Sequence, residues 1–332
     1  MNTELLIDNI KKPNDIKQIP EEKWPELAEE IRAFLLEKVS VTGGHLASNL
    51  GIVELTMALH LALDLPKDKI VFDVGHQSYV HKILTGRKDQ FDTLRKLDGL
   101  CGFPRRYESP CDAFGVGHSS TSISAALGMA MARDMKGTDE TIVAVIGDGA
   151  LSGGMAYEAL NNMSELRKAK KNFIVILNDN NMSISENVGG MSRYLNELRS
   201  DTAYYDFKEN VEKAITNIPR IGEGMARTIK KSKDSIKQLF VPGMFFEDMG
   251  LTYIGPLDGH NISELVRVIH KAKRLREPIV IHVKTKKGKG YPIAEKNPSR
   301  FHGIDAFDIR TGKSIHKKEV ASYTDCFSRK LV

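Results

Sequence analysis

The stretch that decides the fold is TIVAVIGDGA, residues 141–150, which is followed by FIVILNDNNMS, residues 173–183. Each stretch begins as a short, continuous apolar run and ends in polar residues. Continuous apolar runs of this length are typical of strands that are covered on both faces, as in a parallel sheet. The two stretches therefore predict two neighbouring buried strands, each of which ends in polar groups.

Two further apolar runs predict two more strands, KIVFDV from Lys69 and PIVIHVK from Pro278. Helix-like stretches separate the strands, among them STSISAALGMAMARDM from Ser119 and SELVRVIHKAKRL from Ser263, where Ser263 is the expected N-cap. Because strand and helix alternate, the predicted fold class is α/β, with a doubly wound, mostly parallel sheet that has helices on both faces.

The domain organisation is predicted from the remaining segments. Residues 21–39 have apolar positions at helical spacing, and the stretch from Gly51 is apolar on nearly every face, which is typical of a buried helix. Residues about 199–245 are polar and rich in lysine, so we expect an excursion over the surface. We assign residues 1–315 to one domain and residues 316–332 to a linker and the start of a second domain.

Composition excludes several classes of protein. The formal net charge of +5 is spread over many segments, and acidic residues interrupt its densest stretch, so a solvated surface is favoured over a nucleic-acid site. Cys101, Cys111 and Cys326 are odd in number and lack metal-ligand spacing. The sequence shows no signal-peptide core and no apolar run as long as a membrane span. We therefore expect a cytoplasmic protein with no membrane or nucleic-acid partner.

The polar residues after the two central strands indicate a metal and phosphate site. Asp148 and Asn180 would both lie at the carboxyl ends of parallel strands, where α/β proteins bind ligands. Both side chains offer oxygen, which Mg²⁺ prefers. Gly147 and Gly149 would let the backbone approach a phosphate, and a helix starting near Ala150 would direct its N-terminus at it. The alternative is that the two motifs are unrelated turns.

Histidines and lysines supply further candidates. His45, His76 and His118 each follow a glycine in a loop, although a single loop histidine is more often a surface residue. His260 also follows a glycine, but we interpret its loop as a turn of the fold. The other histidines are expected to be structural: His60, His81, His270, His282 and His316.

The lysines that follow the last predicted strand allow two interpretations. They form the end of that strand and the KGKG loop after it, at Lys284, Lys286, Lys287 and Lys289. They could be a solvated strand end, or they could lie near the diphosphate, which the neighbouring glycines favour. The sequence leaves both interpretations open.

Five motifs give the chain a family resemblance. They are GGHLASNLG at His45, VFDVGHQSYVHKILTGR at His76, GVGHSSTSIS at His118, SENVGG after the NDN turn, and YIGPLDGHN at His260. Together with the GDG and NDN elements, they resemble the 1-deoxy-D-xylulose-5-phosphate synthases, which are transketolase-like thiamine-diphosphate enzymes. The likeness runs from about residue 30 to the C-terminus. Transketolase shares the cofactor signature but lacks GHQSYVHKILTGR and YIGPLDGHN, and the pyruvate dehydrogenase α subunit matches little beyond GDG and NDN.

The resemblance implies a set of site residues. The metal ligands would be Asp148, Asn180 and the backbone carbonyl of Met182. His45 and His302 would line the substrate pocket as catalytic residues. The positions that contact the cofactor would be His76, Gly117, His118, Ser119, Gly149, Ala150, Asn180, Lys289 and Tyr291.

The resemblance also implies an activity. The family joins pyruvate to D-glyceraldehyde 3-phosphate with loss of carbon dioxide, using thiamine diphosphate and Mg²⁺, and so feeds isoprenoid and thiamine biosynthesis. Its members are expected to be homodimers. The glutamate that activates the cofactor belongs to a second, pyrimidine-binding domain, so we expect that domain to be needed in cis or in trans. The alternatives are a thiamine-diphosphate-binding module without activity and the N-terminal subunit of a split transketolase.

Overall fold

The computed structural model describes residues 5–168, 172–185, 187–200, 245–315 and 321–331. The chain divides into two units that interleave along the sequence. The first unit contains residues 1–53, 76–102 and 286–332, and the second contains residues 54–75 and 103–285. The domain boundary expected near residue 315 stays a prediction.

The second unit contains a five-stranded sheet in which every strand pairs in parallel with its neighbours, in the order β1-β2-β3-β5-β4. The α/β fold class with a parallel sheet is therefore confirmed, as are the four predicted strands. The strands are β1 (Lys69–Phe72), β2 (Ile142–Gly147), β3 (Phe173–Asp179), β4 (Thr252–Asp258) and β5 (Pro278–Lys284).

Strand β4 is the element that the sequence interpretation missed, whereas the turn expected at His260 is confirmed directly after this strand. Pro256 cannot donate a backbone hydrogen bond, which argues against a central strand. The structure accommodates it because β4 lies at the edge of the sheet formed by the described residues, where it pairs with β5 on one side. The register also shifts between Ile254 and Leu257, so the proline stands where the ladder is already irregular.

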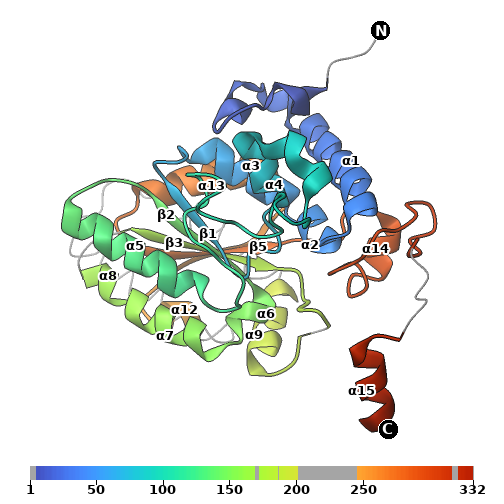
Figure 1. Cartoon of the computed structure of the whole chain (residues 1–332). Coiled ribbons are helices and arrows are strands. Elements are labelled where there is room, and N and C mark those ends of the chain that lie inside the picture. The colour runs from blue at the N-terminus through green and yellow to red at the C-terminus, as the bar shows by residue number, and fades with distance from the viewer. Residues whose placement is uncertain (1–4, 169–171, 186, 201–244, 316–320, 332) are drawn as a thin grey trace. The chain divides into compact units, whose positions relative to one another are not determined.

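Helices cover both faces of this sheet, as predicted (Figure 1). One face carries α5 (Ser122–Lys136), α7 (Gly154–Met163) and α12 (Phe245–Asp248), and the other carries α3 (Val53–Ala62) and α13 (Ile262–Arg274). Every residue of α3 except Leu61 is buried, which confirms the buried helix expected from its apolar sequence. The unit also contains α6 (Asp148–Leu151), α8 (Glu165–Lys168) and α9 (Gly190–Ser200).

The start of α13 corrects the prediction that Ser263 is its N-cap. The cap is Asn261, whose side chain accepts a hydrogen bond from the Glu264 amide at 3.1 Å. Asparagine and serine are both good N-caps, but Asn261 comes first and has extended backbone angles. Ser263 is therefore exposed inside the first turn, and the helix buries Ile262, Leu265, Ile269 and Ala272.

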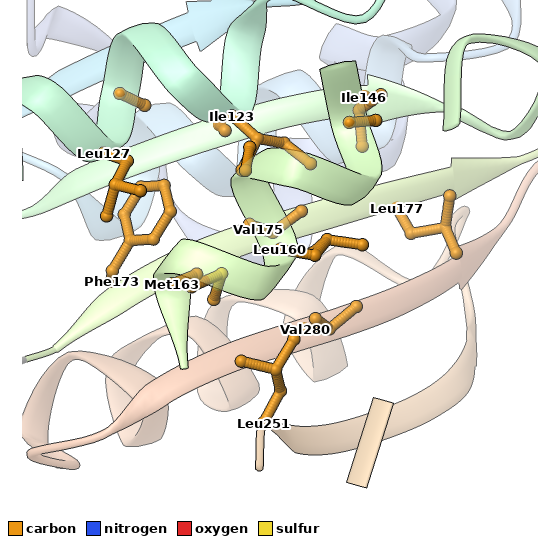
Figure 2. Packing of buried hydrophobic residues seen from close by; sticks show 14 of the residues in the cluster. Ile123, Leu127, Ile146, Leu160, Met163, Phe173, Val175, Leu177, Leu251 and Val280 are labelled. Atoms are coloured by element: carbon orange, nitrogen blue, oxygen red, sulfur yellow. The ribbon is translucent and has the colours of Figure 1, made fainter. Parts of the chain in front are cut away.

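The apolar core of the second unit lies between the sheet and the helices of one face (Figure 2). Ile123 of α5 and Leu160 of α7 are fully buried, together with Phe173 and Val175 of β3. Burying one such side chain stabilises the fold by about 1.5–3 kcal/mol. This packing fixes β2 and β3 side by side, and with them the polar residues at their carboxyl ends.

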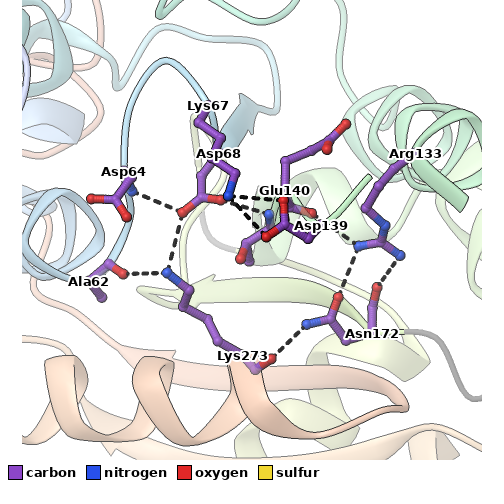
Figure 3. Close-up of polar contacts among 10 residues, drawn as sticks. Ala62, Asp64, Lys67, Asp68, Arg133, Asp139, Glu140, Asn172 and Lys273 are labelled. Carbon is purple, nitrogen blue, oxygen red and sulfur yellow. Dashed lines mark hydrogen bonds and ion pairs between the residues drawn. The ribbon is translucent and has the colours of Figure 1, made fainter. Parts of the chain in front are cut away.

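A polar network holds the opposite, amino-terminal ends of the strands (Figure 3). The buried Asp68 carboxylate accepts hydrogen bonds from the amides of Thr141 at 2.7 Å and Asp64 at 2.9 Å. Lys273 of α13 lies 3.3 Å from the same carboxylate and donates to the Ala62 carbonyl at 2.8 Å. The network joins the starts of β1 and β2 to the last turn of α13.

The first unit is built from helices. The amphipathic helix predicted at 21–39 is confirmed as α1, slightly later in the chain, and it buries Leu27, Ile31, Leu35 and Val39. Helix α1 spans Trp24–Thr42. The other α-helices of this unit are α2 (Leu46–Leu50), α4 (Tyr79–Lys82), α14 (Pro292–Lys296) and α15 (Tyr323–Leu331). Short 3₁₀ or π turns are η1 (Leu6–Asn9), η2 (Asp15–Gln18), η3 (Glu21–Lys23), η4 (Ile83–Arg87) and η5 (Lys88–Thr93).

Two further predictions concern segments rather than strands. The surface excursion expected at about 199–245 lies outside the described residues, apart from its two ends in α9 and α12. Across the part of the chain that the structure describes, no helix combines the length and the apolar character that crossing a membrane requires.

Candidate cofactor and metal site

The first group of candidate residues lies at the carboxyl ends of β2 and β3, in the second unit. Gly147 pairs with Asn178 in the sheet, so the residues that follow each strand begin at the same level. Asp148 is buried as the first residue of α6, and its carboxylate accepts a hydrogen bond from the Asn187 side chain at 2.7 Å. Asn187 belongs to the SENVGG motif. The structure therefore joins GDG and SENVGG at one carboxylate.

The GDG and NDN motifs also meet through Gly149. A Cβ atom added to Gly149 would lie 2.8 Å from the Ser183 Cβ and 3.1 Å from the Ser183 Cα. Real Cβ atoms do not approach other carbons so closely, so only glycine allows this contact. The two strand ends are thus packed against each other, and the interpretation of GDG and NDN as unrelated turns does not fit this contact.

The NDN turn is held by its own side chains. The Asn180 side-chain oxygen accepts a hydrogen bond from the Met182 amide at 3.1 Å, and the Asp179 carboxylate accepts one from the Asn181 amide at 3.0 Å. Asn181 has a φ of +62°, in the left-handed region that asparagine tolerates better than most residues. These two side-chain turns fix the backbone that carries Asn180 and Met182.

The chemistry of this donor set suits Mg²⁺ together with a phosphate-bearing ligand. Among the described residues, no group of three or more His, Cys, Asp or Glu side chains could hold a metal ion. The expected donors are instead one carboxylate, one amide oxygen and one backbone carbonyl, at Asp148, Asn180 and Met182. Mg²⁺ is typically held by one or two carboxylates and completes its octahedron with phosphate oxygens and water. The residues present therefore fit the metal that the family implies.

The helix expected near Ala150 is shorter than predicted and starts earlier. Helix α6 begins at Asp148 and contains only four residues, and α7 starts separately at Gly154. A helix dipole grows with the number of aligned peptide units, so α6 contributes a weak one. Any phosphate bound here would depend on the metal and on individual N–H groups more than on a helix N-terminus.

The loop that carries residues 117–119 is anchored by a residue that the sequence interpretation missed. The buried Asp73 carboxylate, which follows β1, accepts hydrogen bonds from the Ser120 amide at 2.8 Å and the Ser122 amide at 3.0 Å. The Ser120 hydroxyl donates to the Ala150 carbonyl at 2.7 Å. Residues 117–119 are exposed on this anchored loop. An aspartate directly after an apolar run was the available signal, as it was for Asp148.

The second group of candidate residues lies in the first unit, where three predicted histidines come together. The ring centroids of His45 and His76 are 5.6 Å apart, those of His45 and His302 are 5.9 Å apart, and those of His76 and His302 are 5.0 Å apart. The glycines before His45 and His76, namely Gly44 and Gly75, have φ values of +147° and +88°, which favour glycine. The structure therefore confirms that glycine shapes these two loops.

A buried asparagine holds two of these histidines, and sequence interpretation missed it. The Asn49 side chain donates to the backbone carbonyls of His45 at 2.6 Å and His76 at 2.8 Å, and it accepts from the Tyr79 amide at 2.8 Å. The Tyr79 hydroxyl in turn lies 3.2 Å from the His45 amide, which donates to it. His302 is held separately, with its Nδ1 3.4 Å from the Ser48 hydroxyl.

The three rings are neutral at pH 7. Burial is the main cause, and it lowers the pKa of His45 to about 4, with smaller contributions from His302 and Arg95. Burial and the charge of Lys287 lower the pKa of His302 to about 4. The pKa of His76 is lowered well below its ordinary value by burial and by its charged neighbours. The His76 Nδ1 is also buried without a hydrogen-bond partner, which is a costly state that a ligand could relieve.

The lysine that the structure places beside this cluster is Lys287, whereas the sequence interpretation selected Lys289. Lys287 is 6% exposed, and its charge acts on both His76 and His302. Lys289 is only half-buried. In a run such as KKGKG, alternate lysines have similar local sequences, so the buried one could not be identified without the fold.

Tyr291 lies in an aromatic cluster of the first unit. Its ring packs edge-on against Phe301, with centroids 5.5 Å apart, and lies 6.2 Å from Phe307. Its hydroxyl donates to the Ile309 carbonyl at 2.7 Å. Tyr291 thus supports the segment that carries His302, and its contact with a cofactor stays a prediction.

Comparison with known proteins identifies the family. The chain matches the family model of 1-deoxy-D-xylulose-5-phosphate synthase over residues 7–285. It is 58% identical over 327 residues to 1-deoxy-D-xylulose-5-phosphate synthase from Lachnoclostridium phytofermentans, and 56% identical over 326 residues to that from Caldanaerobacter subterraneus. Each match covers 98% of this chain and 52% of the relative. The chain therefore spans about half the length of these relatives.

Solved structures with a similar fold are transketolases. The transketolase from Campylobacter jejuni superposes with a TM-score of 0.63 at 20% identity, covering 87% of this chain and 41% of that one. The transketolase from Leishmania mexicana gives a TM-score of 0.58 at 19% identity, covering 92% and 44%. At this identity the likeness shows the thiamine-diphosphate-binding fold alone. The sequence relatives and the family match decide the rest: the chain belongs to the 1-deoxy-D-xylulose-5-phosphate synthase family.

Proposed function

We propose that this chain supplies the half of a 1-deoxy-D-xylulose-5-phosphate synthase that holds magnesium and the diphosphate of thiamine diphosphate. The reaction would join pyruvate to D-glyceraldehyde 3-phosphate with loss of carbon dioxide, in a homodimer. The observation that carries the proposal is the packed GDG and NDN turns at the ends of two neighbouring parallel strands, within a chain that belongs to this family.

The metal would be held by the Asp148 carboxylate, the Asn180 amide oxygen and the Met182 carbonyl. The NDN turn supports this role because its hydrogen bonds fix the backbone before a ligand arrives. Residues 117–119 and Gly149 would lie against the phosphates, since Asp73 and Ser120 anchor that loop to the GDG turn. Preorganised oxygen donors of this kind cost little to rearrange on binding.

The histidine cluster would serve the reacting part of the site. Bound thiamine diphosphate supplies the electron sink for the carbon bonds that break and form. His45 and His302 would exchange protons with substrate oxygens, and His76, Lys289 and Tyr291 would contact the cofactor. The low pKa of the buried rings keeps them neutral, and a nearby anion would raise that pKa again because it favours the protonated ring. Substrate binding could thus bring these histidines into the range for proton transfer.

Calorimetric titration with thiamine diphosphate and Mg²⁺ tests the binding part of the proposal. Wild type should bind the cofactor only when Mg²⁺ is present, and Asp148→Ala should weaken that binding. Asp139→Ala is the matched control, since its carboxylate is exposed, belongs to the same unit and pairs with Lys67 at the surface. Equal affinity in wild type and Asp148→Ala would contradict the metal assignment.

Assays with pyruvate and D-glyceraldehyde 3-phosphate distinguish the enzyme from a binding module without activity. The family's activating glutamate lies in a pyrimidine-binding domain, so we expect turnover when that domain is supplied and little without it. Cofactor binding with no turnover, even after a pyrimidine-binding domain is supplied, would favour the binding module.

A further inference from the structure

A chain of three buried polar side chains lies behind the NDN turn, in the second unit. The Tyr253 hydroxyl of β4 is 2.7 Å from the His282 Nδ1 of β5, and the His282 Nε2 is 2.9 Å from the Asp179 carboxylate at the end of β3. His282 and Asp179 are completely buried, and Tyr253 is nearly so. These three hydrogen-bonded side chains connect β4, β5 and β3 on one side of the sheet.

The hydrogen-bonding capacity of these groups sets the tautomer of His282. An ionised carboxylate can only accept, so the Nε2 of His282 carries the proton and donates to Asp179. The Nδ1 is then an acceptor and takes the O–H of Tyr253. With this assignment, each donor in the chain faces an acceptor, and burial strengthens the bonds because water cannot compete for them.

The second oxygen of Asp179 reaches the candidate metal turn. It accepts the Asn181 amide at 3.0 Å, whereas the first oxygen accepts from His282. The backbone carbonyl of Asp179 accepts from the Thr285 amide at 2.9 Å, and the Thr285 hydroxyl donates to the Asn178 side chain at 2.6 Å. Asp179 is therefore fixed from both sides, directly before the residue expected to bind the metal.

We propose that His282 is a positioning residue that acts through Asp179 on the NDN turn. With Tyr253 behind it, the imidazole holds the carboxylate in the orientation that caps the Asn181 amide and keeps the left-handed turn closed. The Asn180 side chain and the Met182 carbonyl, which are the proposed Mg²⁺ ligands, are then held in a single orientation. The inference rests on the proposed function, because that function assigns these two oxygens to the metal.

Two substitutions of His282 test whether this residue positions Asp179 or only fills space in the core. His282→Leu fills the site but leaves the Asp179 carboxylate without its donor, whereas His282→Gln can place an N–H near the Nε2 position. We expect His282→Leu to weaken Mg²⁺ binding about 10- to 100-fold in a calorimetric titration with thiamine diphosphate present, as is typical when a residue that orients a metal ligand is removed. His282→Gln should recover most of the affinity, and Tyr253→Phe should fall between His282→Leu and wild type.

Hydrogen exchange at the NDN turn can be measured without cofactor and complements the titration. Solvent exchange of the Asn181 amide, followed by NMR, should be about tenfold faster in His282→Leu, because one hydrogen bond of about 1.4 kcal/mol corresponds to a factor of ten. Asp68→Asn is the matched control. Its carboxylate is buried in the same unit but lies at the amino ends of the strands, so it should lose stability and keep both the Mg²⁺ affinity and the Asn181 exchange rate.

The outcomes separate the two claims. If wild type and Asp148→Ala bind Mg²⁺ and cofactor equally, the proposed function fails. If Asp148→Ala binds weakly while His282→Leu keeps wild-type affinity and Asn181 exchange, the positioning role of His282 is refuted. An equal loss of affinity in Asp68→Asn would show a general loss of stability, and it would also refute that role.

Discussion

Replacing Asn49 by aspartate should loosen the histidine cluster and destabilise the first unit. The substitution keeps the volume and the oxygen that accepts from Tyr79, but it removes the two N–H groups that reach the carbonyls of His45 at 2.6 Å and His76 at 2.8 Å. Each buried acceptor left without its donor costs about 1–3 kcal/mol, so the loss is about 2–6 kcal/mol. This is a large part of the roughly 5–15 kcal/mol that stabilises a typical protein.

Urea unfolding measures this loss, and NMR of the histidine rings reports whether His45 and His76 keep their places. Asn162→Asp is the control, because Asn162 is exposed on α7 and its side chain donates to the Glu158 carbonyl one turn earlier. Exposed changes of this kind stay within about 0.5 kcal/mol. An Asn49→Asp protein as stable as Asn162→Asp, with unchanged ring resonances, would show that Asn49 does not hold the two loops.

Two further predictions concern pH and packing. The pKa values of His45 and His302 are about 4 in the folded chain, below the ordinary 6.5, so the unfolded chain binds more protons below pH 6.5. The free energy of unfolding should therefore fall as pH drops from about 6.5 toward 4 and should stay level above 6.5. Replacing both histidines by asparagine should make the urea midpoint depend less on pH between about 6.5 and 4. An unchanged pH dependence of the midpoint would contradict the assignment. Gly149→Ala should cost about 1–3 kcal/mol through its 2.8 Å contact with Ser183. Ser183→Gly should restore that stability, whereas Gly154→Ala, which meets open space, should be neutral.

Sequence patterns predicted the central strands because a strand that is buried on both faces consists of consecutive apolar residues. Strands β2, β3 and β5 are continuous apolar runs, and the structure buries nearly every residue of each. Strand β4 lies at the edge, where a glycine and a proline are tolerated, so the same criterion fails there. The apolar-run criterion thus fails for the edge strand that contains glycine and proline, whereas it identified β1 at the other edge, which is an apolar run.

The candidate site divides in a similar way. Asp148 and Asn180 were found because each stands directly after an apolar run, and His45 and His76 because a glycine precedes each. Asp179, Asp73 and Asn49 were missed, although all are buried and hold those residues in place. Each has at least one partner far away in the sequence, such as His282 for Asp179, Ser120 for Asp73 and His76 for Asn49, and no local pattern encodes such a pairing. Residues expected to face a ligand could therefore be recognised from their sequence neighbours, whereas the residues that support them could be recognised only from the folded structure.

Each unit contains buried polar groups that support the residues expected to meet a ligand. In the first unit, the groups expected to meet a ligand keep unused hydrogen-bonding or proton-binding capacity. The His76 Nδ1 is buried without a hydrogen-bond partner, and His76 and His302 are neutral because they are buried and lie beside the charge of Lys287. The groups behind them are saturated, since Asn49 uses both its oxygen and its nitrogen and Asp179 uses both its carboxylate oxygens. A saturated support has one low-energy arrangement, so binding need not rearrange it. Substitutions of the supporting residues should therefore change ligand affinity by shifting the positions of the ligand-facing groups. Substitutions of the ligand-facing residues should remove a contact or a proton-transfer group directly.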